Sequence, residues 1–435
     1  MDKKTIFGIP LLLGAVAVVL WLLFGGDPKA GNKFEAMVQS PESLKADSVK
    51  AINMYVDFSG SMRGYIDFAG IESGKNTFIS TVSSMLDNLE STYKVTSESK
   101  CGDKQYGKDP LRLAMQNKAI FNAKTTSIQD MLHVARLKAN KKSLSIIVSD
   151  MVMSWGVTKI RESKDTLYNL TQIDGLGAAI HSEMKSIKDS GLDVMIAQYL
   201  SDYNGNWYCN FTENLKSPNK YKGQKMVNRP YYIFIIGSAN TLKELVYKNC
   251  IKDYKNIYAS FNVDKCSKTV EFNVSAKDGD KYANLWTIGN IENPDTDDIG
   301  TIWTTDDLES SKSTFTFSCN DLFIPAYCFN GECMNLTIES VPDVILSSDI
   351  KYPNFSMDVT LKPFNELESH DIELNVICNN NWAKESSTLN DIEESDMSGK
   401  TWGFAKVIEK IDAAFYPSGR NYNQVVGIFK FKIQK

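Results

Sequence analysis

The strongest constraint on the fold is a change in the spacing of apolar residues part way along the chain. Between Ala51 and Asn249, short apolar runs alternate with stretches in which apolar residues recur every three or four positions. Short apolar runs are typical of buried strands, and the longer spacing is typical of amphipathic helices. Near-continuous apolar strands between such helices predict a mainly parallel sheet covered on both faces. We therefore expect a doubly wound, Rossmann-like α/β domain over residues 48–258.

The order of these segments predicts which strands are neighbours. The predicted strands are 51–57, 143–150, 192–200 and 231–237, with a further pair between Tyr93 and Phe121, and the predicted helices are 76–93, 127–138, 176–190 and 241–249. The strand that ends at Asp150 is then the fourth. In doubly wound sheets of order 3-2-1-4-5-6, strands one and four lie side by side. We therefore expect Asp57 and Asp150 to face each other across one crevice.

From about residue 260, apolar and polar residues alternate strictly between turns rich in Asn, Asp and Gly. The alternating segments are 268–276, 313–319, 334–340, 355–362, 370–378 and 425–435. This pattern is typical of antiparallel strands with one face in solvent. It predicts a β-rich, β-sandwich-like domain over residues 259–435, with one helix at 404–415.

The N-terminus contains a long uncharged segment. Thr5–Phe24 has 20 residues without a charge, which as a helix would span about 30 Å, the thickness of a bilayer core. This is longer than the apolar core of a cleaved signal peptide. We therefore predict a transmembrane anchor at 1–24 and a polar linker at 25–47. Lys3 and Lys4 precede the segment, which favours a single-pass protein whose bulk lies on the extracytoplasmic side.

Composition excludes several functional classes. The net charge is −5 and there is no run of Lys and Arg, so a nucleic-acid-binding protein is not expected. The three histidines are far apart in sequence, which excludes zinc sites of the HExxH type. The eight cysteines are scattered, and both disulfides in an exported protein and buried free thiols are compatible with them.

Three oxygen-bearing side chains follow the first predicted strand. Asp57, Ser59 and Ser61 stand at alternate positions in a loop at the carboxyl edge of the sheet, where α/β domains bind ligands. Asp150 ends the fourth strand at the same edge, and the turn 125–127 before the second helix adds further hydroxyls. Such oxygen ligands suit a hard cation such as Mg²⁺. The alternative is that these residues serve only as turn and capping residues.

The segment DFSGS at 57–61 resembles the D-x-S-x-S signature of von Willebrand factor A domains. In that family an Asp and two Ser of the signature, a Thr and a further Asp form a metal-ion-dependent adhesion site. The matching residues here are Asp57, Ser59, Ser61, Thr126 in TSIQDML and Asp150 in VSDM. Met151 departs from the family, which commonly has glycine there. The resemblance implies a bound Mg²⁺ or Mn²⁺ with one position open for a Glu or Asp carboxylate from a protein partner.

The leading hypothesis is therefore a membrane-anchored module, not an enzyme, that binds a protein partner through a divalent cation. A metal-dependent phosphohydrolase is the alternative, because an Asp after the first strand also suits phosphoryl chemistry. Against it, Ser59 stands where a D-x-D phosphatase loop has its second acid, and no glycine-rich phosphate loop is evident. A third hypothesis is a scaffold whose metal site is not functional.

Overall fold

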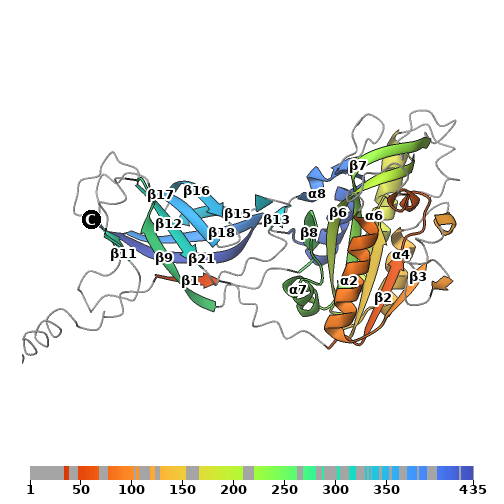
Figure 1. Cartoon of the computed structure of the whole chain (residues 1–435), viewed down its shortest axis with the longest axis horizontal. Helices are drawn as coiled ribbons and strands as arrows, with labels where there is room; N and C mark the ends of the chain where they lie inside the picture. Colours follow the sequence, from red (N-terminus) through yellow and green to blue (C-terminus); the bar gives the residue numbers. More distant parts are fainter. Residues whose placement is uncertain are drawn as a thin grey trace, which may run out of the picture.

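The structure has an α/β lobe and a β lobe, each built from segments far apart in sequence (Figure 1). The computed structural model describes the following parts of the chain: 34–38, 48–67, 77–101, 104–106, 118–122, 128–152, 166–208, 220–261, 268–280, 287–288, 301–303, 313–319, 329–330, 333–334, 336–341, 345–351, 355–361, 370–379, 382–388, 399–420 and 423–434.

The sheet of the α/β lobe has the strand order β4-β3-β2-β5-β7-β6-β8. In chain order the strands are β2 (Ala51–Val56), β3 (Ser97–Cys101), β4 (Lys104–Tyr106), β5 (Ser143–Ser149), β6 (Asp193–Tyr208), β7 (Lys220–Gly237) and β8 (Asn256–Ala259). Strand β2 runs parallel to β3 and to β5. The other pairings in this sheet, of β3 with β4, β5 with β7, β6 with β7 and β6 with β8, are antiparallel.

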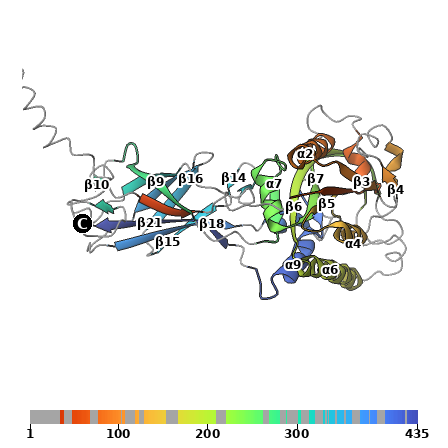
Figure 2. The ribbon, with the colours of Figure 1, turned by 90° about the horizontal axis from the view of Figure 1, so that it is seen from below.

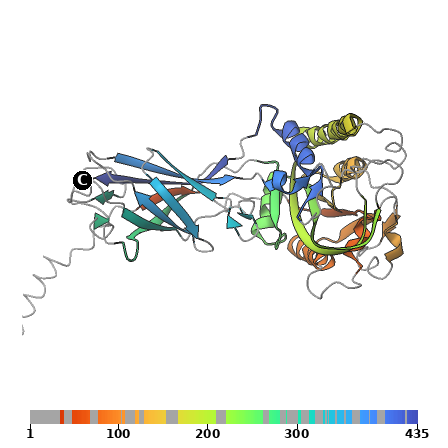
Figure 3. The same cartoon turned by 90° about the horizontal axis from the view of Figure 1, so that it is seen from above.

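The predicted doubly wound, mainly parallel fold is therefore wrong. The segments predicted as separate strands at 192–200 and 231–237 are the inner halves of β6 and β7, which pair antiparallel from Asp193 opposite Gly237 to Tyr208 opposite Lys220. Figure 3 shows this long pair strongly curved. Parallel neighbours need a long crossover, usually a helix, and no helix had been predicted between these two segments.

Helices cover both faces of this sheet (Figure 2). One face carries α2 (Phe78–Tyr93) and α7 (Ala239–Tyr247), and the other carries α4 (Ile128–Lys138), α6 (Thr166–Asp189) and α9 (Phe404–Phe415). Successive strand residues point to opposite faces. In β7, Ile233 and Ile235 therefore join the core under α2, whereas Phe234 and Ile236 join the core under α6 and α9.

The C-terminal part of the chain returns to the α/β lobe. The segment comprises α8 (Trp382–Glu385), β19 (Ser387–Thr388), β20 (Thr401–Trp402) and α9. Phe404 stacks on Tyr232 with ring centroids 4.3 Å apart and on Trp382 at 5.4 Å. Residues 382–420 thus complete the second core, although they fall in the segment predicted as the C-terminal domain.

The β lobe is one ten-stranded sheet, in place of the two stacked sheets of the predicted sandwich. Its path is β10-β11-β21-β1-β9-β12-β17-β16, with β18 joining β21 to β15. The strands are β1 (Phe34–Val38), β9 (Lys268–Ala276), β10 (Thr287–Ile288), β11 (Thr301–Trp303), β12 (Ser313–Cys319), β15 (Leu336–Val341), β16 (Ile345–Lys351), β17 (Phe355–Leu361), β18 (His370–Asn379) and β21 (Asn423–Gln434). The sheet curls so that β15 contacts β16 at its other end. The short pair β13 (Phe329–Asn330) and β14 (Cys333–Met334) lies apart from it.

Phenylalanines fill the interior of the curled sheet. Phe272 of β9 packs against Phe317 of β12 and Phe429 of β21, with centroids 5.6 and 5.0 Å apart. Phe34 of β1 lies 5.3 Å from the same ring. The segment 25–47, predicted as a linker, therefore contributes a strand to this lobe.

The prediction of a single-pass membrane protein is also corrected. None of the helices in the described parts of the chain is both long enough and apolar enough to cross a bilayer. The segment on which the prediction rested, Thr5–Phe24, lies outside the described residues, and the membrane assignment is withdrawn.

Because α9 packs in the core of the α/β lobe, we expect the substitution Phe404→Ala to destabilise this lobe. Removing a fully buried aromatic ring should lower the free energy of unfolding by about 3–5 kcal/mol, measured by urea denaturation. Leu137→Ala is the control, because Leu137 is exposed on α4 and its loss should cost less than ~0.5 kcal/mol. Equal effects of the two variants would contradict the packing of α9.

Candidate metal centre

The predicted site begins where β2 and β5 end side by side. Val56 is opposite Val148 in the parallel register, so the prediction that the first and fourth strands are neighbours is confirmed. The Asp57 amide donates to the Val148 carbonyl at 2.8 Å, so the hydrogen bonding between β2 and β5 extends one residue beyond the end of β2. Asp57 and Asp150 are each 3% exposed. Two buried acids thus follow adjacent strands at one edge of the sheet.

The carboxylate of Asp57 is fixed by two hydrogen bonds. The Ser59 amide donates to Oδ1 at 2.7 Å, and the Ser149 hydroxyl donates to Oδ2 at 2.9 Å. The Met151 amide in turn donates to the Ser149 hydroxyl at 3.0 Å. A carboxylate oxygen has two lone pairs, and carboxylates at such loops are suitable ligands for a hard cation.

The hydroxyls of the two serines in the loop form a hydrogen bond with each other. Their hydroxyl oxygens, Ser59 Oγ and Ser61 Oγ, lie 2.9 Å apart. Adjacent ligands at ~2.1 Å in an octahedral Mg²⁺ shell are separated by ~3 Å. The spacing of these hydroxyls therefore fits neighbouring positions around one small cation.

Asp150 is held by the backbone and by a buried arginine. Its Oδ1 accepts from the Val152 amide at 3.3 Å, and its Oδ2 lies 3.5 Å from Nη2 of Arg229. Met151 between them has φ 52°, a left-handed conformation that disfavours a residue with a side chain. Its side chain is buried in the core under α6, and this burial offsets the strain. A methionine can thus make the turn at which the family commonly has glycine.

Arg229 was not predicted from the sequence. It lies on β7, is 5% exposed, and its guanidinium sits 4.6 Å from the ring centre of Tyr203. Its Nε has no hydrogen-bond partner among the described residues. Arg229 stands two residues before the apolar segment 231–237, and an arginine so close to a buried strand is a weak sequence signal for a buried ion pair, because a buried charge requires a partner. The sequence does not reveal that this partner is Asp150.

Aromatic side chains pack the loop that follows β2 against strand β6. The 3₁₀ turn η2 (Met62–Tyr65) places the ring of Tyr65 5.1 Å from that of Tyr203, and its hydroxyl donates to the Pro230 carbonyl at 2.5 Å. Gly64 is required for this contact, since a Cβ there would lie 2.2 Å from Cε2 of Tyr203. The loop is therefore pre-organised against the β6–β7 hairpin.

The remaining predicted ligand is Thr126, which lies outside the described residues; α4 begins just after it, at Ile128. No group of three or more His, Cys, Asp or Glu side chains capable of holding a metal was found in the described parts of the chain. A site here would consist of two carboxylates and neutral hydroxyls. With Arg229 beside it, the formal charge of the set Asp57, Asp150 and Arg229 is −1.

Comparisons with known proteins add no further assignment. No family model matches the chain, and no similar protein was found among curated proteins or solved structures.

Because Asp150 and Arg229 form a buried ion pair, we expect the variant Arg229→Met to be much less stable than the parent protein. Asp150 would be left buried without its cation, which should lower the free energy of unfolding by about 3–5 kcal/mol. The double variant Arg229→Met/Asp150→Asn removes both charges and should recover most of this loss. Chemical denaturation of the three proteins without added metal measures the effect. A double variant no more stable than Arg229→Met would contradict the pairing.

Proposed function

We propose that the chain binds an acidic group of a protein partner through a divalent cation, Mg²⁺ or Mn²⁺, at the loop after β2. Asp57, Ser59, Ser61 and Asp150 would hold the cation, with Thr126 as the fifth ligand. The observation that carries the proposal is the 2.9 Å separation of the Ser59 and Ser61 hydroxyls beside a buried carboxylate. When bound, the cation supplies an open coordination position for a carboxylate.

The charges favour an anionic partner. Asp57, Asp150 and Arg229 sum to −1, so a divalent cation would bring the buried set to +1. A positive charge in a poorly hydrated setting attracts a carboxylate more strongly than it does in water. Arg229 is thus proposed to weaken cation affinity while strengthening the attraction of the occupied site for acids.

The resemblance of DFSGS to the von Willebrand factor A signature is a second, independent support. It concerns the loop and its ligands. The sheet around them departs from the doubly wound arrangement, and the proposal does not depend on that arrangement.

We expect the protein to bind Mn²⁺ with one site per chain, measured by titration calorimetry. Asp57→Ala should abolish Mn²⁺ binding, because it removes the central carboxylate. Ser59→Ala removes one neutral ligand and should weaken Mn²⁺ binding about tenfold, which corresponds to about 1.4 kcal/mol of binding free energy. Asp87→Ala is the matched control, since it removes an exposed carboxylate of α2 and should bind Mn²⁺ as the parent does.

Arg229→Met supplies a test of the charge argument. Loss of the competing cation should raise the affinity for Mn²⁺ by about tenfold or more, even though the metal-free protein is less stable. Unchanged affinity would show that Arg229 does not compete for Asp150. Hydrolysis of a phosphate ester that disappears in Asp57→Ala would instead favour the phosphohydrolase.

Partner binding is tested by capture from cell extract on the immobilised full chain, with Mn²⁺ or with chelator. The partner should be retained only with Mn²⁺ and be lost from Asp57→Ala but not from Asp87→Ala. Replacement of one Glu or Asp of the partner by Gln or Asn should abolish retention. Retention that is equal in chelator would contradict a metal-mediated contact.

A further inference from the structure

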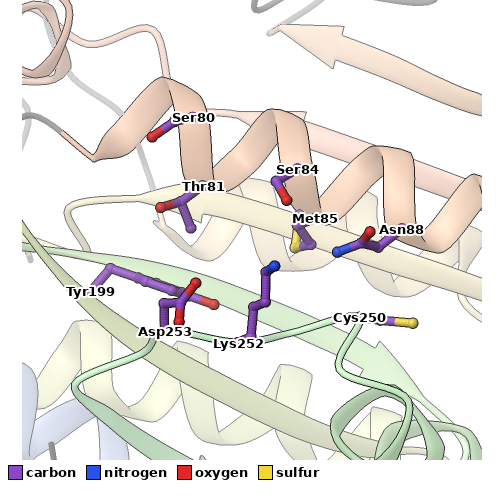
Figure 4. Close-up of a pocket in the computed structure, with 9 residues that line it drawn as sticks. All are labelled: Ser80, Thr81, Ser84, Met85, Asn88, Tyr199, Cys250, Lys252 and Asp253. Carbon is purple, nitrogen blue, oxygen red and sulfur yellow. The ribbon is translucent and has the colours of Figure 1, made fainter. Parts of the chain in front are cut away.

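A separate polar pocket lies between α2 and the segment that follows α7 (Figure 4). Its volume is about 240 Å³, below the ~300 Å³ at which pockets for drug-sized ligands begin. None of the candidate metal ligands lines it. Its occupant would therefore be small and would bind independently of the metal centre.

The helix wall of this pocket carries a row of polar side chains. Thr81, Ser84 and Asn88 line it, and their spacing of three and four places them on one helix face. A polar row of this kind is usually the solvated face of an amphipathic helix. Here all three residues are half-buried, and Figure 4 shows them opposite a second polar wall.

Tyr199 of β6 supplies the observation that points to a ligand. The residue is 2% exposed, and its ring stacks on Tyr231 with centroids 5.3 Å apart. Tyr199 lines the pocket, and its buried hydroxyl has no hydrogen-bond partner among the described residues. An unsatisfied buried hydroxyl is costly, and a bound ligand would satisfy it. Burial raises the pKa of the Tyr199 phenol well above its ordinary value, so the group remains neutral and can both donate and accept.

The wall opposite α2 carries one positive and one negative side chain. Lys252 and Asp253 are neighbours in the segment after α7, and both line the pocket. Asp253 has φ 58°, a left-handed conformation that Asp tolerates better than most residues. The two charges sum to zero, so the pocket suits a ligand without net charge, and the carboxylate would repel an anion such as phosphate.

We propose that this pocket binds a neutral polyhydroxylated ligand of monosaccharide size. Sugar hydroxyls both donate and accept, and the pocket offers ammonium and amide donors, carboxylate acceptors and hydroxyls that do either. Burial raises the pKa of the Cys250 thiol at the pocket's edge, which leaves it protonated and a poor nucleophile. The site therefore binds its ligand without covalent chemistry.

The test is calorimetric titration of the full chain with glucose, galactose, mannose and N-acetylglucosamine, and with inorganic phosphate and glycine as anionic and zwitterionic probes. At least one sugar should bind saturably, and phosphate and glycine should not. Tyr199→Phe should weaken sugar binding about tenfold without lowering the melting temperature, because the lost hydroxyl has no partner in the free protein. Asn88→Ala should weaken it as well.

Tyr232→Phe is the matched control. The Tyr232 hydroxyl donates to Thr401 Oγ1 at 3.0 Å and accepts from Gln198 Nε2 at 3.2 Å on the other face of the sheet. Its loss should lower the melting temperature and leave sugar affinity unchanged. Asp57→Ala should also leave sugar affinity unchanged, which separates this site from the proposed metal centre. Absence of sugar binding, equal affinity in Tyr199→Phe, binding of phosphate or glycine instead, or loss of sugar binding in Asp57→Ala would overturn the proposal.

Discussion

The parallel pairing of β2 with β5 is the interaction on which the candidate site depends. It places Val56 opposite Val148, so that Asp57 and the Ser149–Asp150 pair leave the sheet at the same edge. The hydroxyl of Ser149 then reaches the Asp57 carboxylate directly. Without this register, residues more than ninety positions apart in sequence could not share one buried set of oxygens.

A second constraint is the burial of Asp150 with Arg229. The arginine comes from the β6–β7 hairpin, and its guanidinium packs on Tyr203, whose ring also lies against Gly64 and Tyr65 behind the loop. The loop and the hairpin are therefore packed as one unit around an internal ion pair. Under the proposed function, a cation at Asp150 would compete with Arg229, which already pairs with this carboxylate at 3.5 Å.

Local elements could be predicted from the sequence because hydrophobic periodicity is a local property. The helix predicted at 404–415 is α9 with the same bounds, and 76–93 differs from α2 by two residues at its start. The direction of β6 and β7, the packing of α9 on Tyr232 and the strand at Phe34–Val38 depend on distant contacts and were not predicted. For the site, strand order predicted that Asp57 and Asp150 follow neighbouring strands, as the pairing of β2 with β5 shows, and the binding of a cation between them stays a prediction. The ion pair of Asp150 with Arg229 joins residues 79 positions apart in sequence and arises only when β5 pairs with β7.

Anomalous diffraction from crystals of the full chain grown with Mn²⁺ would show whether the Asp57 loop binds a divalent cation. We expect one strong peak at ~2.0–2.3 Å, the range for a small oxygen-bound cation, from Ser59 Oγ and Ser61 Oγ, beside the carboxylates of Asp57 and Asp150. An empty loop in Mn²⁺-saturated crystals, with the Arg229 guanidinium still paired to Asp150, would contradict it.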